Sequence, residues 1–231
     1  AYEFSHPLMQ TSPNAKKKSG VLLISSDRGL CGSFNAQLFR ATEDFIGNEL
    51  SGKECMYFVI GAKAERTYRK QTGELAFSAS KLTPEMRQHV SSEVAGLLVE
   101  NYLKDEIDEA YLVFNGYSSR SDFGFRTRKL LPFAPIEQDT VEKRTGCRFI
   151  IEPSVTGLLD VLIPLYSRAL IADAMIQSQT AEELSRMLAM DYATENANEL
   201  IGDLTLLYNR TRQAVITKEI SEIVGGAEAL K

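Results

Sequence analysis

The sequence predicts an α/β protein with a Rossmann-like, mostly parallel sheet domain and a long C-terminal coiled-coil helix. Short apolar runs alternate with helical patterns through the first two thirds of the chain, which is typical of a parallel sheet flanked by helices. After Pro153 the strand signals stop and one helical pattern continues almost to the end. We therefore divide the 231 residues into an irregular segment 1–19, a sheet domain 20–152 and a helix 153–231.

The elements of the sheet domain follow one another in regular order. The start of the chain holds Pro7, Pro13 and the lysine run 16–18, which we expect to be a solvated loop. Apolar runs bounded by turn signals predict strands at 21–25, 55–60, 75–79 and 111–115. Two later stretches, 123–135 and 147–153, are predicted to be antiparallel edge strands.

Three helices are predicted between these strands, near 34–50, 61–71 and 84–103. The start of the third is the best marked, because Thr83 can act as its N-cap and Pro84 suits the first helical position. The alternation of strand and helix thus reaches to about residue 115.

The C-terminal helix is much longer than the helices of ordinary globular domains. About 70 residues at 1.5 Å each give a length of roughly 100 Å, against a usual helix of about 11 residues. Breaks or kinks are expected at Pro164 or within 178–183, and the pair Gly225–Gly226 is expected to end the helix.

A coiled-coil seam is predicted on this helix. Apolar and small residues recur at alternating steps of three and four over about four heptads. A domain of this size cannot cover so long a helix, so we expect the partner helix to lie outside this chain. The seam comprises Met187, Met190, Thr194, Ala197, Ile201, Leu204, Tyr208, Thr211 and Val215.

Composition excludes several classes of function. The net charge of −5 gives no sign of a nucleic-acid-binding face, and no window of 18 apolar residues predicts a membrane span. The start of the chain lacks the features of a signal peptide. Three widely spaced cysteines without a C-x-x-C pair favour neither disulfides nor zinc, and two histidines without an acidic cluster of ligand spacing do not predict a metal site. We expect no metal and no cofactor.

One stretch matches the sequence pattern of a phosphate-binding loop but not its structural context. The letters 47-GNELSGK-53 fit G-x-x-x-x-G-K, but a true phosphate loop follows a strand and opens a helix. Here the stretch closes a helix, where carbonyl groups are free, and Glu54 stands where Ser or Thr would bind magnesium. We expect a helix stop, a turn and an exposed Lys53 instead.

The loop 25-SSDRGLCGSFN-35 raises the possibility of a reactive site. It has only the spacing Gly29-x-x-Gly32, and Asp27 is expected to cap the helix that follows. Cys31 stands near that helix's N-terminus, where a thiolate is favoured. A catalytic cysteine needs a base, however, and neither His6 nor His89 is well placed in the sequence to provide it. We therefore favour packing and turning roles for the glycines and Cys31.

Both ends of the chain resemble the gamma subunit of rotary ATP synthases. The stretch 25–39 is similar to that family's S-D-R-G-L-C-G-x-x-N signature, and 207–230 resembles its C-terminal signature Y-N-x-x-R-Q-x-x-I-T-x-E-x-x-E-I-V-x-G. The middle stretch 160–190 is also similar to the family. A small departure is Ser33, where a second glycine is common.

The resemblance implies a non-catalytic rotor subunit that couples proton-driven rotation to ATP synthesis at the beta subunits. The C-terminal helix would form the axle together with an N-terminal helix that precedes residue 1 and is missing here. Implied partners are the alpha and beta subunits of the head, an epsilon-type subunit and the membrane rotor ring, with no nucleic acid and no small-molecule substrate. Implied partner contacts are Asp27, Arg28, Gly29, Cys31, Arg210, Arg212, Gln213 and Lys218.

The resemblance also implies a peripheral position on an energy-transducing membrane. We expect the cytoplasmic face of a bacterial inner membrane, with the mitochondrial matrix face as the alternative. Two other functions stay open on the residues alone. One is a small Rossmann-like nucleotide-binding enzyme with a helical dimerisation arm, which would use 47–53 or the crevice beside Asp27. The other is a stand-alone coiled-coil adaptor that self-associates through the seam.

Overall fold

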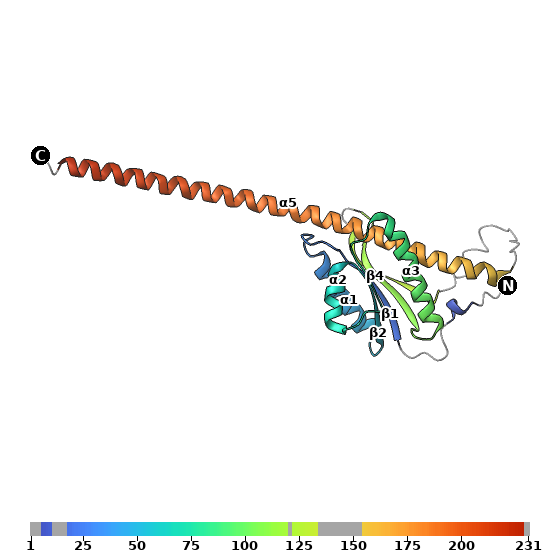
Figure 1. Cartoon of the computed structure of the whole chain (residues 1–231). Helices are drawn as coiled ribbons and strands as arrows, with labels where there is room; N and C mark the ends of the chain where they lie inside the picture. Colours follow the sequence, from blue (N-terminus) through green and yellow to red (C-terminus); the bar gives the residue numbers. More distant parts are fainter. Residues whose placement is uncertain (1–5, 11–17, 120–121, 134–153, 229–231) are drawn as a thin grey trace. The chain divides into compact units, whose positions relative to one another are not determined.

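The computed structural model describes residues 6–10, 18–119, 122–133 and 154–228. The chain divides into two compact units, residues 1–186 and 187–231. Most of the first unit is a five-stranded sheet with helices on both faces, and the second is the continuation of one helix (Figure 1).

The sheet has the order β3-β2-β1-β4-β5. Strand β1 (Lys18–Ile24) pairs in parallel with β2 (Glu54–Ile60) and with β4 (Glu109–Tyr117), and β2 pairs in parallel with β3 (Phe77–Ala79). Strand β5 (Phe123–Leu131) runs antiparallel to β4 at one edge. The mostly parallel sheet and the first of the two edge strands are therefore confirmed, whereas the predicted strand 147–153 lies outside the described residues.

Helices α1 (Phe34–Glu49), α2 (Ala62–Thr72) and α3 (Pro84–Leu103) agree closely with the prediction. Thr83 caps α3, since its side-chain oxygen accepts a hydrogen bond from the backbone N–H of Met86 at 3.4 Å. A short 3₁₀ turn, η1 (Pro7–Met9), precedes the sheet. Lys18 does not lie in a solvated loop as predicted, because it opens β1, and its amine lies 3.3 Å from the carboxylate of Glu54.

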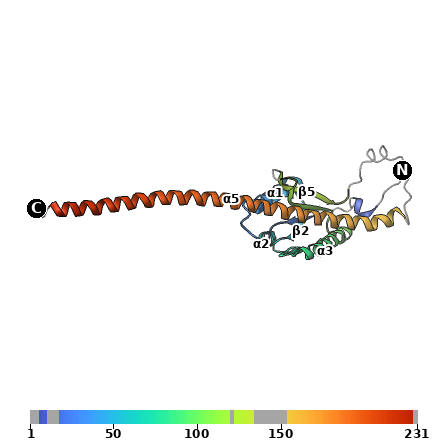
Figure 2. The same cartoon turned by 90° about the horizontal axis from the view of Figure 1, so that it is seen from above.

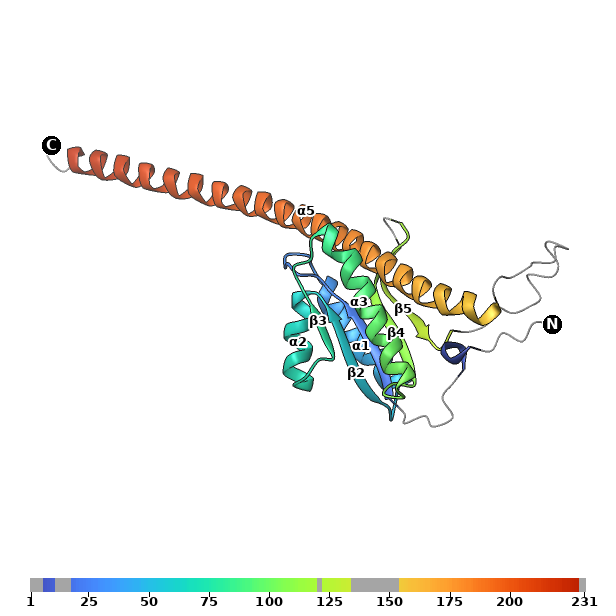
Figure 3. The same cartoon turned by 45° about the vertical axis from the view of Figure 1, so that its right-hand side comes forward.

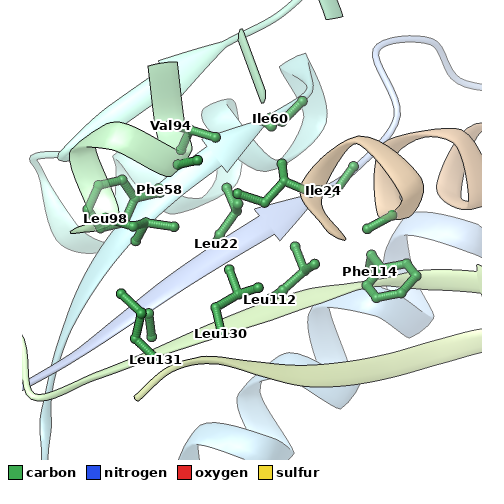
Figure 4. Close-up of a cluster of buried hydrophobic side chains, with 14 of the residues drawn as sticks. Leu22, Ile24, Phe58, Ile60, Val94, Leu98, Leu112, Phe114, Leu130 and Leu131 are labelled. Carbon is green, nitrogen blue, oxygen red and sulfur yellow. The ribbon is translucent and has the colours of Figure 1, made fainter. Parts of the chain in front are cut away.

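The helices cover opposite faces of the sheet (Figures 2 and 3). Successive side chains of a strand point to opposite faces, so Val21 and Leu23 pack beneath α1 and α2, while Leu22 and Ile24 face α3 and the first part of α5. Figure 4 shows this second core, in which Phe58, Val94 and Leu112 join the strand residues. Both faces are buried, as expected for parallel strands.

Helix α5 spans Val155–Glu228 without interruption. It passes through Pro164 and through 178–183, so neither of the expected break points interrupts it. The prediction that Gly225–Gly226 ends the helix is wrong by two residues. Neither glycine adopts the left-handed conformation that terminates helices, and the helix ends at Glu228. The part up to Arg186 belongs to the first unit, where Ile171 and Ala174 are buried in the core.

Candidate functional site

The loop that follows β1 is held at the carboxyl ends of the parallel strands. The hydroxyl of Ser25 accepts a hydrogen bond from the N–H of Ala64 in α2 at 2.9 Å. Gly61 comes so close to this loop that a side chain there would lie 2.3 Å from the Ser25 carbonyl oxygen, and its φ of +105° also favours glycine. These contacts hold the loop that leads into α1 against the loop that leads into α2.

Asp27 caps a different helix from the one predicted. Its carboxylate accepts hydrogen bonds from the backbone N–H groups of Ala62 and Lys81, each at 2.9 Å. Ala62 is the first residue of α2, whereas the N-cap of α1 is Ser33, which makes no side-chain capping bond. Asp27 therefore places a negative charge at the N-terminus of α2, where the helix dipole and the free N–H groups favour it.

The next residues of the loop bind helix α5. The guanidinium of Arg28 lies 2.8 Å from the carboxylate of Glu183, and the carbonyl oxygen of Gly29 accepts a hydrogen bond from Arg186 at 3.4 Å. The hydroxyl of Ser185 donates to the carbonyl oxygen of Cys31 at 2.8 Å. Glu183 is held by Arg186 as well as by Arg28, and its pKa is lowered by these two guanidinium groups. Burial opposes this lowering of the pKa.

Cys31 is a packing residue. It is only 2% exposed and lies with Phe34 and Ala181 in a small cluster of its own. Its sulfur lies 3.4 Å from the side-chain amide of Asn35, which also donates to the hydroxyl of Ser26 at 2.8 Å. The structure thus brings Asp27, Arg28, Gly29 and Cys31 together, but it leaves the Cys31 thiol no open surface.

Leu30 also belongs to this stretch, and its apolar side chain is largely exposed to solvent although the sequence did not mark it. Leu30 is 78% exposed and has a φ of +60°. An apolar letter between two glycines, in 29-GLCG-32, is the signal that could have drawn attention to it. Ser185 and Arg186, which hold the loop on the helix, gave no signal in the sequence beyond a helical pattern.

A cavity of about 370 Å³ lies beside this loop. Its wall includes Asp27, Lys81, Arg87 and Glu182. Both acidic and basic side chains line it, and the N–H groups of the first residues of α2 are already bound, that of Ala62 by the Asp27 carboxylate and that of Ala64 by the Ser25 hydroxyl. This geometry disfavours the nucleotide-binding alternative in the crevice beside Asp27.

The stretch 47–53, which matches the phosphate-loop pattern, ends helix α1 as expected. Lys53, however, is not the exposed residue that we expected. Helix α1 ends at Glu49, and Gly52 follows in a left-handed conformation. The Lys53 amine lies 2.7 Å from the carboxylate of Glu109, which also pairs with Lys129 at 3.1 Å. Burial alone would raise the pKa of Glu109, but the two lysines and the Tyr111 hydroxyl lower it to about 2.

The second unit presents the remaining predicted site residues along the helix. Arg210, Arg212, Gln213 and Lys218 are all exposed, and Lys218 pairs only loosely with Glu222 at 3.7 Å. The large apolar members of the seam are exposed too, with Ile201 at 62% and Leu204 at 55%. No contact in the structure tests the predicted seam or these partner contacts, so they stay predictions.

Neither a membrane-spanning helix nor a metal site is found in the described parts of the chain. No described helix is long and apolar enough to cross a bilayer. The described residues also include no group of three or more His, Cys, Asp and Glu side chains that could hold a metal ion.

Comparison with known proteins decides the family. The sequence profile of the ATP synthase family matches residues 1–230. A curated ATP synthase gamma chain of Chlorobaculum parvum is 40% identical over 220 residues, covering 91% of this chain and 73% of that protein. The chain belongs to the ATP synthase gamma family. Another gamma chain, from Mycobacterium marinum, is 37% identical over 241 residues, and the match covers 97% of this chain and 78% of that protein.

Solved structures share the fold of this gamma-family chain. The mitochondrial ATP synthase of Euglena gracilis contains a chain that matches with a TM-score of 0.65 at 20% identity, covering 93% of this chain and 73% of that one. A central-stalk structure from Tetrahymena thermophila matches with a TM-score of 0.61 at 20% identity, covering 80% of each chain. The resemblance found in the two signatures is confirmed.

Proposed function

We propose that this chain is the central rotor subunit of a proton-translocating ATP synthase. The observation that carries the proposal is its membership of the gamma family over almost the whole chain, with relatives named as ATP synthase gamma chains. The helix in the second unit fits that role, because a helix with so many exposed apolar side chains requires partners to cover them.

The second unit forms the axle within the ring of alpha and beta subunits. Its seam packs against a partner helix, because large apolar seam residues such as Ile201 and Leu204 are exposed in the second unit. The chain spans 73–78% of the length of its gamma-chain relatives. Ile220, Ile223 and Val224 are 56%, 70% and 56% exposed and would run in an apolar sleeve of the head.

The charged face of the axle contacts the catalytic subunits one at a time. Arg210, Arg212, Gln213 and Lys218 are exposed, so their side chains are free to meet acidic loops of a beta subunit. As the axle turns, these contacts break at one beta subunit and form at the next. The breaking and forming of these contacts couples rotation of the axle to the opening of each catalytic site.

The chain itself is non-catalytic in this account. The fold places a carboxylate, that of Asp27, where a nucleotide-binding relative of this architecture would bind phosphate. The sheet unit instead contacts an epsilon-type subunit and the membrane rotor ring. The complex is peripheral to an energy-transducing membrane, and we place this chain on the cytoplasmic face of a bacterial inner membrane.

Co-purification tests the proposal. The chain is co-expressed with alpha and beta subunits, and the tagged beta subunit is isolated. We expect this chain in the complex at fewer copies than beta, because a single axle serves several catalytic subunits. Equal copy number, or no recovery of the chain with beta, would refute the rotor role. The unrelated exposed substitution Asp44→Ala on α1 should leave recovery unchanged.

A further inference from the structure

The cavity of about 370 Å³ has an apolar floor at the carboxyl ends of two parallel strands. Ile24 and Ile60, the last residues of β1 and β2, line it together with Met175 of α5, and all three are buried. Ligands of open α/β sheets bind outside the carboxyl ends of the strands, in cavities of roughly 300–1,000 Å³. The cavity therefore has the position and the size to hold a small organic molecule.

The carboxylates on the rim of this cavity already have partners within the chain. Asp27 accepts two backbone N–H groups. Glu182 pairs with Arg186, and Glu183 pairs with both Arg186 and Arg28. The rim thus has no unpaired carboxylate with which to attract a cationic ligand.

Two cations on the same rim lack a carboxylate partner. Lys81 and Arg87 line the cavity, and neither forms an ion pair with any described residue. Arg87 donates instead to the neutral side chain of Gln179. Lys81 has a φ of +57°, a conformation that is disfavoured for residues with a Cβ and that gathers at ligand sites. The rim therefore presents two positive charges to an anion.

A buried hydroxyl inside the cavity also lacks a partner. Ser178 of α5 lines the cavity and is only 3% exposed, and its side chain makes no hydrogen bond with any described residue. The nearby hydroxyl of Thr180, in contrast, donates to the carbonyl oxygen of Ile176 at 3.0 Å. Buried polar groups are almost always hydrogen-bonded to protein, water or ligand. An occupant of the cavity would supply the bond that Ser178 does not make within the chain.

We propose that this cavity binds a small organic acid with one carboxylate and a short aliphatic body. The carboxylate pairs with Lys81 and Arg87 and accepts a hydrogen bond from the Ser178 hydroxyl, while the aliphatic body lies on the apolar floor. A phosphate ligand is disfavoured, because the Asp27 carboxylate on the rim repels a second negative charge and holds the N–H that begins α2. The inference is independent of the rotor function, since every group that it uses lies in the first unit.

Calorimetric titration of the full chain with hexanoate tests the site. We expect saturable binding at one site with a Kd of about 1 mM or tighter. Hexanamide has the same body without the charge, and acetate has the charge without the body, so each should bind about tenfold more weakly or worse. Equal affinity for acetate and hexanoate would mean an adventitious ion only and would overturn the proposal. Absence of saturation with hexanoate at about twenty times the expected Kd would also overturn it.

Substitutions locate the binding. Lys81→Gln and Arg87→Gln should each weaken hexanoate binding about tenfold, because each removes a charge-assisted hydrogen bond. Lys70→Gln, on the exposed face of α2, is the matched control and should leave affinity unchanged. In NMR spectra with labelled methionine methyl groups, hexanoate should shift the signal of Met175 but not that of Met190 in the second unit.

Two outcomes of these variants would refute the site. One is a loss of affinity in Lys70→Gln as large as in the rim variants, and the other is a Met175 signal that does not move while hexanoate binds. A thermal melt shows whether each variant is folded. If Lys81→Gln is not folded, Lys81→Gly replaces it, because glycine suits the positive φ at this position. Refutation of the site would leave the proposed rotor function unaffected.

Discussion

Asp27 and Ala62 are joined across the carboxyl end of the sheet, with the Asp27 carboxylate 2.9 Å from the backbone nitrogen that begins α2. In nucleotide-binding proteins of similar architecture, the N–H groups at such a helix start bind phosphate. Here a side chain of the protein itself supplies the negative charge. The same carboxylate binds the N–H of Lys81, so it fastens two further loops to the one after β1.

We predict that the isolated chain neither binds nor hydrolyses ATP. The anion position at α2 is occupied by Asp27, and the amine of Lys53 pairs with Glu109 instead of facing open solvent. Equilibrium titration with labelled ATP and magnesium measures this. Micromolar binding that disappears in Lys53→Ala would overturn the assignment and favour the nucleotide-binding enzyme.

Acid should destabilise the sheet unit through Glu109. Its pKa is about 2 in the folded chain, below the ordinary value of 4.5, so its stabilising contribution is complete above about pH 4.5 and is lost as the pH falls toward 2. At pH 7, Glu109→Gln should reduce the free energy of unfolding by about 2–3 kcal/mol. Urea unfolding from pH 7 to pH 2.5 should show this difference shrinking, because below about pH 4.5 the unfolded chain binds a proton at Glu109 that the folded chain does not.

Glu54→Gln is the matched control for that experiment. Glu54 also pairs with a lysine, Lys18, but its side chain is 73% exposed. An exposed pair contributes only about 0–1 kcal/mol. The role of the Glu109 ion pairs would be contradicted if Glu54→Gln cost as much stability as Glu109→Gln. It would also be contradicted if the effect of Glu109→Gln did not change with pH.

Replacing Ile201 and Leu204 together by aspartate should reduce any self-association of the isolated chain without unfolding the sheet unit. Both side chains are exposed in the second unit, and the sheet has its own cores. Light scattering and a thermal melt provide the two readouts. Leu206→Asp, which is 59% exposed and off the seam, is the control and should leave association unchanged. Loss of the sheet unit's cooperative melt in the double variant would place the seam in the domain core.

Arg212→Ala combined with Gln213→Ala should leave assembly near normal and slow ATP turnover of the complete complex. Hydrogen bonds to charged groups contribute about 1.5–3 kcal/mol, so losing them should weaken coupling more than folding. Turnover is measured beside subunit stoichiometry, with Glu219→Ala on the same helix as a control. Full activity with normal assembly would mean that Arg212 and Gln213 are solvated and make no functional contact. Loss of assembly alone would mean that their role is structural.

The sequence was sufficient for the order of the elements and insufficient for the contacts between them. Apolar runs and the Thr83–Pro84 start located the strands and α3, because period and capping are local properties. The partners of Asp27 and Lys53 lie 35 and 56 residues away, so no local pattern could name Ala62 or Glu109. Leu30 was missed for a related reason, since its exposure depends on contacts that the neighbouring residues make with α5.

Observation of rotation tests the rotor assignment most directly. A light-scattering rod is attached to an exposed cysteine introduced at Leu103, and the head is fixed by its beta subunits. We predict stepwise rotation of the rod in one direction when ATP is added, and arrest when ATP is removed. A rod that stays still on complexes whose beta subunits hydrolyse ATP would contradict the claim that this chain is the rotor.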